Sequence, residues 1–368
     1  MGSAGIALER FVIKFLAKTI GMENNADGVL TSGGTLGNLT ALLAARQIKS
    51  NNNIWSEGID NEYVPVFLVS EESHYSVERA IHIMGIGDKG IVKVPVNDNH
   101  KMDMDTIKKY YEKSVAEKRN VVCLVGNACS TSLGLYDPLN EMAEFCKEHN
   151  LWFHVDAAHG GPAAFSKKYK HLIKGIEQAD SVVIDFHKML MQPALVTAVL
   201  FKNDEHSYQT FSQKASYLWD TNEKDWYNLG KRTFECTKDT MSLKVYSTLR
   251  TYGTELFEDN VTALFDLGKK FADIINHRNN FELAISPESN IVCFRYKLNN
   301  YEDEKLNDLN KRIRQILIED GEFFIVQTEI NKKIFLRTCL MNSFTTEKDL
   351  ISLLDRIDEI VQKLNHSD

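Results

Sequence analysis

The sequence lacks the features of several classes of protein. Its 368 residues carry a formal net charge of -8, so it has no excess of basic residues for nucleic acid, and any phosphate site must be local. No stretch reaches the ~18 consecutive apolar residues of a membrane span. The N-terminus also lacks the apolar run and small-residue cleavage site of a signal peptide. We therefore expect neither nucleic acid nor a membrane as a partner.

The six cysteines form no recognisable pattern. They lie far apart, and none belongs to a C-x-x-C pair, which argues against a disulfide framework and against a zinc knuckle. His154 and His159 are close in sequence, but no third ligand stands at a suitable spacing, so we expect no metal site. Reduced cysteines in a chain without a signal peptide predict a cytoplasmic protein.

Short apolar segments alternate with helical patterns over the first two thirds of the chain. A first helix is expected at residues 6–20, where apolar residues recur at helical spacing. Strands are then expected at residues 66–69, 91–94, 121–125, 152–155, 181–184 and 196–201. This alternation is typical of an α/β fold with a large, mostly parallel sheet. Ligands of such sheets bind at the carboxyl ends of the strands.

The pattern changes near residue 255. Beyond it we expect strands at residues 281–285, 291–296, 323–327 and 334–338, interleaved with helices at residues 306–319 and 347–364. This is the pattern of a smaller α+β domain. The sequence therefore predicts a large domain at residues 1–255 and a small C-terminal domain at residues 256–368.

Two residues at expected strand ends suggest pyridoxal 5'-phosphate (PLP) chemistry. Lys188 follows strand 181–184 among apolar neighbours, where desolvation would lower the pKa of its amine and make it a better nucleophile. Asp156 follows strand 152–155, where a carboxylate is costly unless it is paired. PLP requires a lysine for its Schiff base and an anion at its ring nitrogen. Taken singly, however, such a lysine is usually a solvated surface residue, and such an aspartate serves equally well as a cap.

Other residues could complete such a site. Gly34 and Thr35 open a helix just after Ser32, so backbone N–H groups and the positive helix end could hold a phosphate. Glycine clusters also make plain turns, and this one lacks the Lys-Ser/Thr of a nucleotide-binding P-loop. Ala158 is small enough to let a ring lie flat against it, and His74 could stack on the opposite face, although a lone histidine is more often structural.

Taken in order, the motifs resemble those of the group II pyridoxal-dependent decarboxylases, which have the aspartate aminotransferase fold (fold type I). The shared motifs are TSGGTLGN at 31–38, HYS at 74–76, HVDAAHGG at 154–161, ADS at 179–181, HK at 187–188, FECTK at 234–238 and LRT at 336–338, followed by Asn342 and Thr345-Thr346. The resemblance therefore covers essentially the whole chain. It implies a PLP-dependent transferase-like α/β fold and a homodimer.

The resemblance also implies roles for individual residues. Lys188 would hold PLP, Asp156 would pair with the ring nitrogen, and His74 and Ala158 would cover the two faces of the ring. The phosphate would be held by Gly34, Thr35 and His187, with Asp185 close by.

Further roles follow from the same resemblance. Asn127 falls near the cofactor, and Arg337 matches an arginine that meets a substrate carboxylate in some members. A loop tyrosine returns the proton to the α-carbon in related enzymes, for which Tyr227 is the first candidate and Tyr217 the second, with His74 as an alternative.

The implied activity is decarboxylation of an L-amino acid to an amine and carbon dioxide. The sequence Met191-Gln192-Pro193 is reminiscent of members that act on diamino acids such as 2,4-diaminobutyrate or lysine, while aromatic and acidic amino acids stay open. The alternatives are another fold type I reaction, either transamination or an aldehyde-forming decarboxylation, and a PLP-binding protein with impaired catalysis.

Three departures from the family pattern bear on these expectations. Members usually have a further N-terminal segment that supplies dimer contacts and part of the substrate pocket. Where they commonly show Thr-x-Gly-Thr-Thr, this chain has Asn127-Ala128-Cys129-Ser130-Thr131, so cofactor contacts there are expected to differ. The stretch around Lys238-Asp239 lacks the second basic residue that is common at that point.

Overall fold

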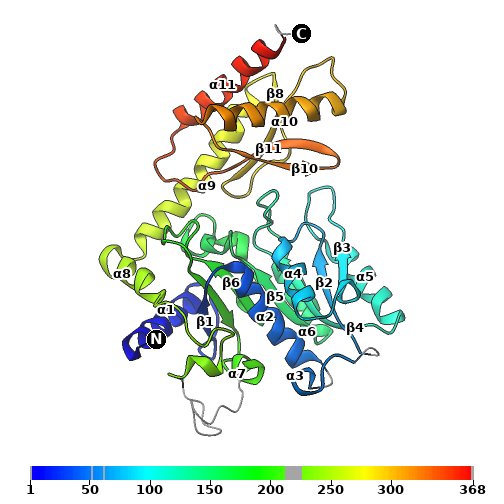
Figure 1. Ribbon diagram of the computed structural model, residues 1–368, viewed down its shortest axis with the longest axis vertical. Helices are drawn as coiled ribbons and strands as arrows, with labels where there is room; N and C mark the ends of the chain where they lie inside the picture. Colours follow the sequence, from blue (N-terminus) through cyan, green and yellow to red (C-terminus); the bar gives the residue numbers. More distant parts are fainter. Residues whose placement is uncertain (1, 51–52, 61–62, 212–225, 366–368) are drawn as a thin grey trace. The chain divides into compact units, whose positions relative to one another are not determined.

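The computed structural model describes residues 2–50, 53–60, 63–211 and 226–365. The chain divides into two compact units, the first made of Met1–Thr131 and Tyr136–Val261 and the second of Ser132–Leu135 and Thr262–Asp368. The division falls within helix α9 (Glu255–Asn276), drawn in yellow in Figure 1.

A seven-stranded sheet forms the centre of the first unit. Its strands are β1 (Asp27–Thr31), β2 (Pro65–Ser70), β3 (Ile91–Val94), β4 (Asn120–Asn127), β5 (Trp152–Asp156), β6 (Ser181–Asp185) and β7 (Thr197–Phe201). They are arranged in the order β1-β7-β6-β5-β4-β2-β3. The pairings among β6, β5, β4, β2 and β3 are parallel, and β7 pairs antiparallel with both β1 and β6. The predicted mostly parallel sheet is confirmed.

Helices accompany this sheet, and α2 packs directly against it. The helices of the first unit are α1 (Ser3–Thr19), α2 (Gly34–Lys49), α3 (Ile54–Glu57), α4 (Tyr75–Ile83), α5 (Met104–Ala116), α6 (Leu139–Glu148), α7 (Glu205–Phe211) and α8 (Ser242–Tyr252). Helix α2 contacts β4, β5, β6 and β7 (Figure 1), and its completely buried Ala41 and Leu42 belong to the same core cluster as Val183 and Val199 of the sheet. This apolar packing fixes the N-terminal end of α2 beside the strand ends.

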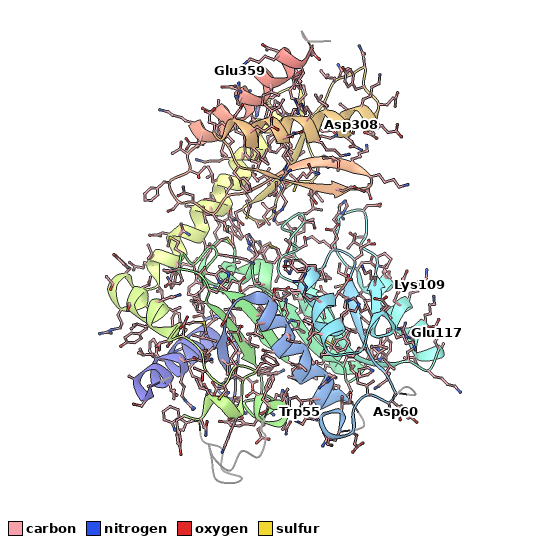
Figure 2. The ribbon with its side chains drawn as sticks, in the orientation of Figure 1. Trp55, Asp60, Lys109, Glu117, Asp308 and Glu359 are labelled. Atoms are coloured by element: carbon pink, nitrogen blue, oxygen red, sulfur yellow. The ribbon has the colours of Figure 1, made fainter. Side chains whose placement is uncertain are left out.

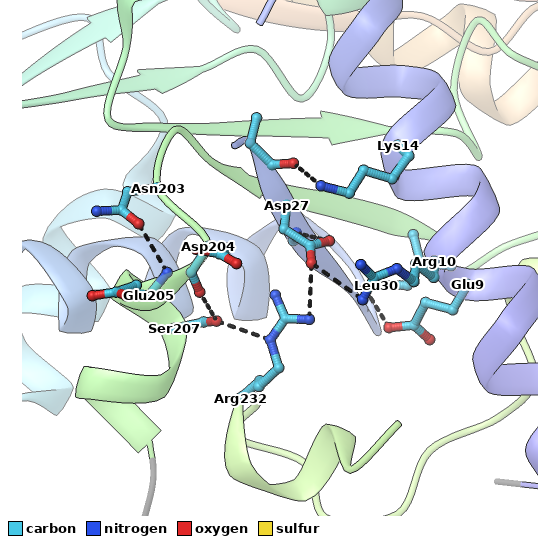
Figure 3. A network of polar contacts seen from close by, with 12 residues as sticks. Glu9, Arg10, Lys14, Asp27, Leu30, Asn203, Asp204, Glu205, Ser207 and Arg232 are labelled. Carbon is cyan, nitrogen blue, oxygen red and sulfur yellow. Dashed lines mark hydrogen bonds and ion pairs between the residues drawn. The ribbon is translucent and has the colours of Figure 1, made fainter. Parts of the chain in front are cut away.

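Buried ionic contacts attach α1 to the rest of the first unit (Figure 3). Glu9 Oε1 on α1 accepts a hydrogen bond from the backbone N–H of Leu30 at 2.9 Å. Arg10 Nη1 on α1 lies 3.9 Å from Asp27 Oδ2 at the start of β1, and the same oxygen accepts a hydrogen bond from Arg232 Nη1 at 3.2 Å. Lys238 Nζ lies 2.6 Å from the same Glu9 oxygen. Because both carboxylates are buried, loss of one partner would leave a desolvated charge.

The second unit has a four-stranded antiparallel sheet in the order β10-β11-β9-β8. Its elements after α9 are β8 (Phe281–Leu283), β9 (Ile291–Tyr296), α10 (Asp303–Asp320), β10 (Val326–Ile330), β11 (Lys333–Cys339) and α11 (Glu347–Asn365). Phe271, Phe294 and Ile357 are buried in its core. The alternation of helices and strands agrees with the predicted α+β character.

One predicted strand in the second unit is misplaced. The sequence suggested residues 323–327, but β10 begins three residues later, and Phe324 is 79% exposed. The reason is the turn at Asn331 and Lys332, where both residues have positive φ, 50° and 65°. Such a two-residue turn sets the hairpin register, and here it places Ile330 opposite Lys333.

The surface carries charged side chains on both units. Lys109 and Glu117 of the first unit and Asp308 and Glu359 of the second are labelled in Figure 2. Among the described helices, none combines the length and the apolar character needed to span a bilayer.

Candidate active site

A cavity of about 280 Å³ lies in the first unit at the carboxyl ends of the strands. It brings together eight of the residues that the sequence singled out, namely Gly34, Thr35, His74, Asp156, Ala158, Asp185, His187 and Lys188. They come from the start of α2, the start of α4 and the segments that end β5 and β6. Parallel strands bring these ends to one edge of the sheet, which is why residues far apart in sequence meet here.

The N-terminal end of α2 forms one wall of the cavity. Its N-cap residue, Gly33, has φ 103°, and no side chain caps the helix. The first backbone N–H groups are therefore available to an anion, and the helix dipole favours one. A β-carbon on Gly34 would lie 3.4 Å from both carboxylate oxygens of Asp185, so glycine keeps this approach open.

Lys188 forms an ion pair at the floor of the cavity. Its Nζ lies 2.9 Å from Asp185 Oδ2, and Asp185 Oδ1 accepts a hydrogen bond from Thr197 Oγ1 at 2.5 Å. Burial lowers the pKa of Lys188, but the Asp185 carboxylate together with Asp156 and Cys129 outweighs burial, and the pKa lies above its ordinary value. The expectation that desolvation would lower this pKa is therefore wrong, because it left out the carboxylate three residues earlier.

Asp156 ends β5 and is 7% exposed. Its Oδ2 accepts a hydrogen bond from Asn38 Nδ2 at 2.9 Å, and its Oδ1 accepts one from the backbone N–H of Ala158 at 3.1 Å. These two hydrogen bonds hold the carboxylate of Asp156 in one orientation. A buried carboxylate with a cavity in front of it suits a cationic partner.

His74 stands at the N-cap of α4. Its Nδ1 accepts a hydrogen bond from the backbone N–H of Ser76 at 3.3 Å and lies 2.7 Å from the Ser76 hydroxyl. Burial lowers the pKa of His74, although the nearby Asp156 partly opposes this. A neutral His74 therefore carries its proton on Nε2.

His187 follows the end of β6 by two residues and directly precedes Lys188. Its Nδ1 is 3.2 Å from the backbone nitrogen of Val196, and its Nε2 is 3.7 Å from Asp185 Oδ2. The backbone of Val196 thus holds the imidazole in place. The imidazole lines the same cavity as the start of α2, where the phosphate is expected.

Four predicted residues lie elsewhere or cannot be placed. Asn127 ends β4 and is 3% exposed, and its Oδ1 accepts a hydrogen bond from Ser73 Oγ at 3.1 Å, outside the cavity lining. Tyr227 is 54% exposed beside Trp226 and is also outside that lining. Arg337 belongs to the second unit, where its Nε donates to the carbonyl oxygen of Ser132 at 3.2 Å. Tyr217 lies outside the described residues.

The structure also adds residues that the sequence reasoning gave no role. Asn38, Ser76, Cys129, Thr131 and Leu195 line the cavity. Asn38 could have been found from its spacing, because it follows Gly34 by four residues and so lies on the same face of α2. Cys129 and Thr131 lie in the stretch that departs from the family pattern.

Gln192, part of the sequence that suggested a diamino acid, does not line the cavity. Its side chain donates to the carbonyl oxygen of Leu190 at 3.0 Å and accepts from Thr248 Oγ1 at 3.2 Å.

The donors and acceptors of the cavity fit PLP. An amine, a buried carboxylate, an imidazole and an uncapped helix end match its aldehyde, ring nitrogen, ring face and phosphate. When bound, PLP supplies a cationic ring that accepts the electrons left by bond cleavage at the α-carbon of an amino acid.

Comparisons with known proteins agree with this fit. The conserved domain of pyridoxal-dependent decarboxylases matches residues 3–297. An aromatic-L-amino-acid decarboxylase of Bacillus atrophaeus is 28% identical over 369 residues, which cover 100% of this chain and 75% of that protein. An L-2,4-diaminobutyrate decarboxylase of Acinetobacter baumannii is 31% identical over 368 residues, which cover 96% of this chain and 72% of that protein.

A solved structure shares the fold. The glutamate decarboxylase domain of diaminobutyrate-pyruvate transaminase and L-2,4-diaminobutyrate decarboxylase from Vibrio parahaemolyticus matches with a TM-score of 0.86 and 26% identity, over 98% of this chain and 73% of that one. The chain therefore belongs to the pyridoxal-dependent decarboxylase family and is a PLP-dependent amino-acid decarboxylase of fold type I.

Proposed function

We propose that the protein decarboxylates an L-amino acid with a second amino group, such as 2,4-diaminobutyrate or lysine, to the corresponding amine and carbon dioxide. The similarity to the Acinetobacter baumannii enzyme supports this choice. The similarity to the Bacillus atrophaeus enzyme supports the aromatic alternative, and acidic amino acids are a further alternative, since acidic amino acid decarboxylases are also among the relatives.

The observation that favours a diamino acid is the carboxylate of Glu235. Its Oε1 accepts a hydrogen bond from Ser32 Oγ at 2.7 Å, and Ser32 lines the cavity. Its Oε2 is buried and makes no hydrogen bond to any described residue. A buried acceptor without a donor is costly. Glu235 does not itself line the cavity, and the charge of Lys238 is already near it, so in this proposal a second ammonium group on the substrate approaches Glu235 beside Ser32 and supplies the missing donor.

In this proposal the residues of the cavity bind and orient. Lys188 holds PLP covalently, Asp156 pairs with its ring nitrogen, and His74 and Ala158 enclose the ring. The phosphate lies at Gly34, Thr35 and His187, with Asp185 and Asn127 close to the cofactor. Arg337 is assigned to the substrate carboxylate, and Tyr227 or His74 to the return of a proton to the α-carbon.

A panel of substrates tests the proposal. Carbon dioxide release would be measured with L-2,4-diaminobutyrate, L-lysine, L-tryptophan, L-aspartate and L-glutamate, together with identification of the organic product. The highest kcat/KM with a diamino acid supports the proposal, and a higher value with an aromatic or acidic amino acid overturns it. A keto acid product would indicate transamination, and an aldehyde would indicate oxidative decarboxylation. PLP binding without any product would indicate an impaired enzyme.

We also propose a cytoplasmic homodimer, with a PLP-binding domain at residues 1–255 and a small domain at residues 256–368. Light scattering of the purified full chain tests the oligomeric state. A molar mass near twice the 42.0 kDa of the chain supports a dimer, and a value near 42.0 kDa contradicts it.

A further inference from the structure

A continuous chain of hydrogen bonds runs behind the cavity, through the interior of the first unit. It begins at the Trp152 indole, whose Nε1 lies 2.8 Å from Ser181 Oγ. Ser181 Oγ lies 2.9 Å from His154 Nδ1, and His154 Nε2 lies 3.1 Å from Asn38 Oδ1. Trp152, Ser181 and His154 are completely buried, and Asn38 is 1% exposed. Each bond has the length of a normal hydrogen bond.

The indole takes one acceptor position of Ser181. Trp152 Nε1 can donate but not accept, so the Ser181 oxygen accepts from it. The second lone pair and the hydroxyl proton of Ser181 still allow it either to accept from His154 Nδ1 or to donate to it. Burial lowers the pKa of His154 to about 4, and near neutral pH its ring carries one proton. In the direction in which Ser181 Oγ donates to Nδ1, that proton lies on Nε2 and is donated to Asn38 Oδ1.

The opposite end of the chain requires the same direction. Asp156 as a carboxylate can accept but not donate, so Asn38 must present its amide N–H groups to it, and its Oδ1 must face His154. The carboxylate therefore fixes the orientation of Asn38 and with it the donor role of His154 Nε2, and the indole at the other end is compatible with this direction. Reversing the amide would bring its oxygen against the Asp156 carboxylate.

Asn38 also connects to His74, through Ser76. Its Nδ2 lies 2.9 Å from Ser76 Oγ as well as 2.9 Å from Asp156 Oδ2, so its two amide protons serve two partners. Ser76 Oγ accepts one of them and can donate its own proton to His74 Nδ1 at 2.7 Å. One amide thus joins the groups assigned to the ring nitrogen and to the ring face.

We propose that Asn38 is a positioning residue, oriented by Trp152, Ser181 and His154, that holds Asp156 as a carboxylate aimed into the cavity and His74 with its proton on Nε2. The inference rests on the proposed roles of Asp156 and His74 and extends them to Asn38 in the cavity lining and, through Asn38, to Trp152, Ser181 and His154, which do not line the cavity. His154 orients Asn38, and Asn38 acts through Asp156 and His74.

Nitrogen-15 NMR of histidine-labelled protein without PLP tests the direction of the chain. We expect the signals of His154 to show a neutral ring protonated on Nε2, and they are assigned by their loss in His154→Gln. A proton on Nδ1 of His154 overturns the proposal whatever the substrate proves to be. This measurement is therefore independent of the proposed activity.

A pair of variants tests the effect on the cofactor. His154→Gln offers an amide N–H in the position of Nε2, whereas His154→Leu removes the donor to Asn38. With ring-labelled PLP, we expect His154→Leu to lower the fraction of protonated ring nitrogen, and His154→Gln to keep it near that of the unaltered protein. We expect kcat to fall about tenfold in His154→Leu with little change in KM, as when an outer partner of a site residue is lost.

Two controls keep the test decisive. Asn260→Leu removes another buried amide of the first unit, which donates to the carbonyl oxygen of Met189, and should leave the ring nitrogen unchanged. If His154→Leu does not fold, Asn38→Leu replaces it, with the same expected loss of ring protonation. An unchanged ring nitrogen in a folded His154→Leu or Asn38→Leu protein overturns the proposal.

Discussion

Asp185 Oδ2 lies 2.9 Å from Lys188 Nζ, so the amine assigned to PLP is held as an ammonium group by a carboxylate three residues before it. An amine must lose its proton before it attacks a carbonyl. The ion pair therefore holds the Lys188 side chain in place and lowers the fraction of neutral amine. The ratio of ammonium to neutral amine depends on Asp185.

Lys188→Ala should abolish covalent attachment of PLP, because no other described residue that lines the cavity carries a primary amine. The measurement is borohydride reduction in the presence of PLP, followed by mass spectrometry of the intact chain. Lys244→Ala removes a half-buried lysine of α8 that donates to the carbonyl oxygen of Pro193 and does not line the cavity, so it is a control and should retain the attachment. A reduced PLP adduct at the active site of Lys188→Ala protein would refute the assignment.

Asp185→Asn should lower the pKa of Lys188, because it removes the carboxylate that raises this pKa while burial still lowers it. The pH at which PLP attaches at half its maximal rate should fall by about one unit or more. Absorbance spectra recorded as PLP is added across a pH series follow the attachment. Glu205→Gln serves as a control for the loss of a surface carboxylate, and an unchanged pH profile in Asp185→Asn would contradict the role of the ion pair.

Replacement of His154 should change the acid side of the stability profile. Its pKa is lowered from 6.5 to about 4 by burial, so between these values the unfolded chain binds a proton that the folded chain does not. The free energy of unfolding should therefore fall as the pH drops from about 6.5 to 4, by up to about 3 kcal/mol from this group.

In His154→Gln protein this contribution disappears, and the loss of stability over that interval should be smaller. Denaturant unfolding of both proteins at pH 7, 5.5 and 4.5 measures the difference. Comparing the two proteins is necessary because burial raises the pKa of Asp137 to about 6. The raised pKa of Asp137 makes the free energy of unfolding rise as the pH drops over much of the same interval. This contribution is common to both proteins and cancels in the comparison. Parallel pH profiles would show that His154 is not kept neutral.

Glu235→Gln should weaken the use of diamino acids selectively. It keeps the shape of the side chain and its contact with Ser32 but removes the negative charge. We expect kcat/KM to fall about tenfold or more for 2,4-diaminobutyrate or lysine, with little change for an amino acid without a second charge. Steady-state kinetics with both kinds of substrate give the ratio. An equal loss for both would mean that Glu235 acts on the fold or the cofactor and not on the substrate side chain.

Local patterns in the sequence were sufficient for the elements and for much of the candidate site. The apolar strands, the helix that opens at Gly34 and the polar residues at strand ends predict an α/β fold whose cavity contains Lys188, Asp156 and His74. These inferences depend on short-range periodicity and on the rule that parallel strands gather their carboxyl ends. The position of β10 was not predictable in this way, because the positive φ values of Asn331 and Lys332 set its register.

What the sequence determined by itself is the set of chemical groups, since residue types at strand ends follow from local pattern. The tertiary structure decided how those groups are charged and oriented. It placed Asp185 against Lys188, which raises a pKa that burial alone would lower. It also joined Trp152, Ser181, His154 and Asn38, which come from three separate segments, behind Asp156. Electrostatic and hydrogen-bond energies depend on distances of a few ångströms, and such distances between remote segments are set by packing.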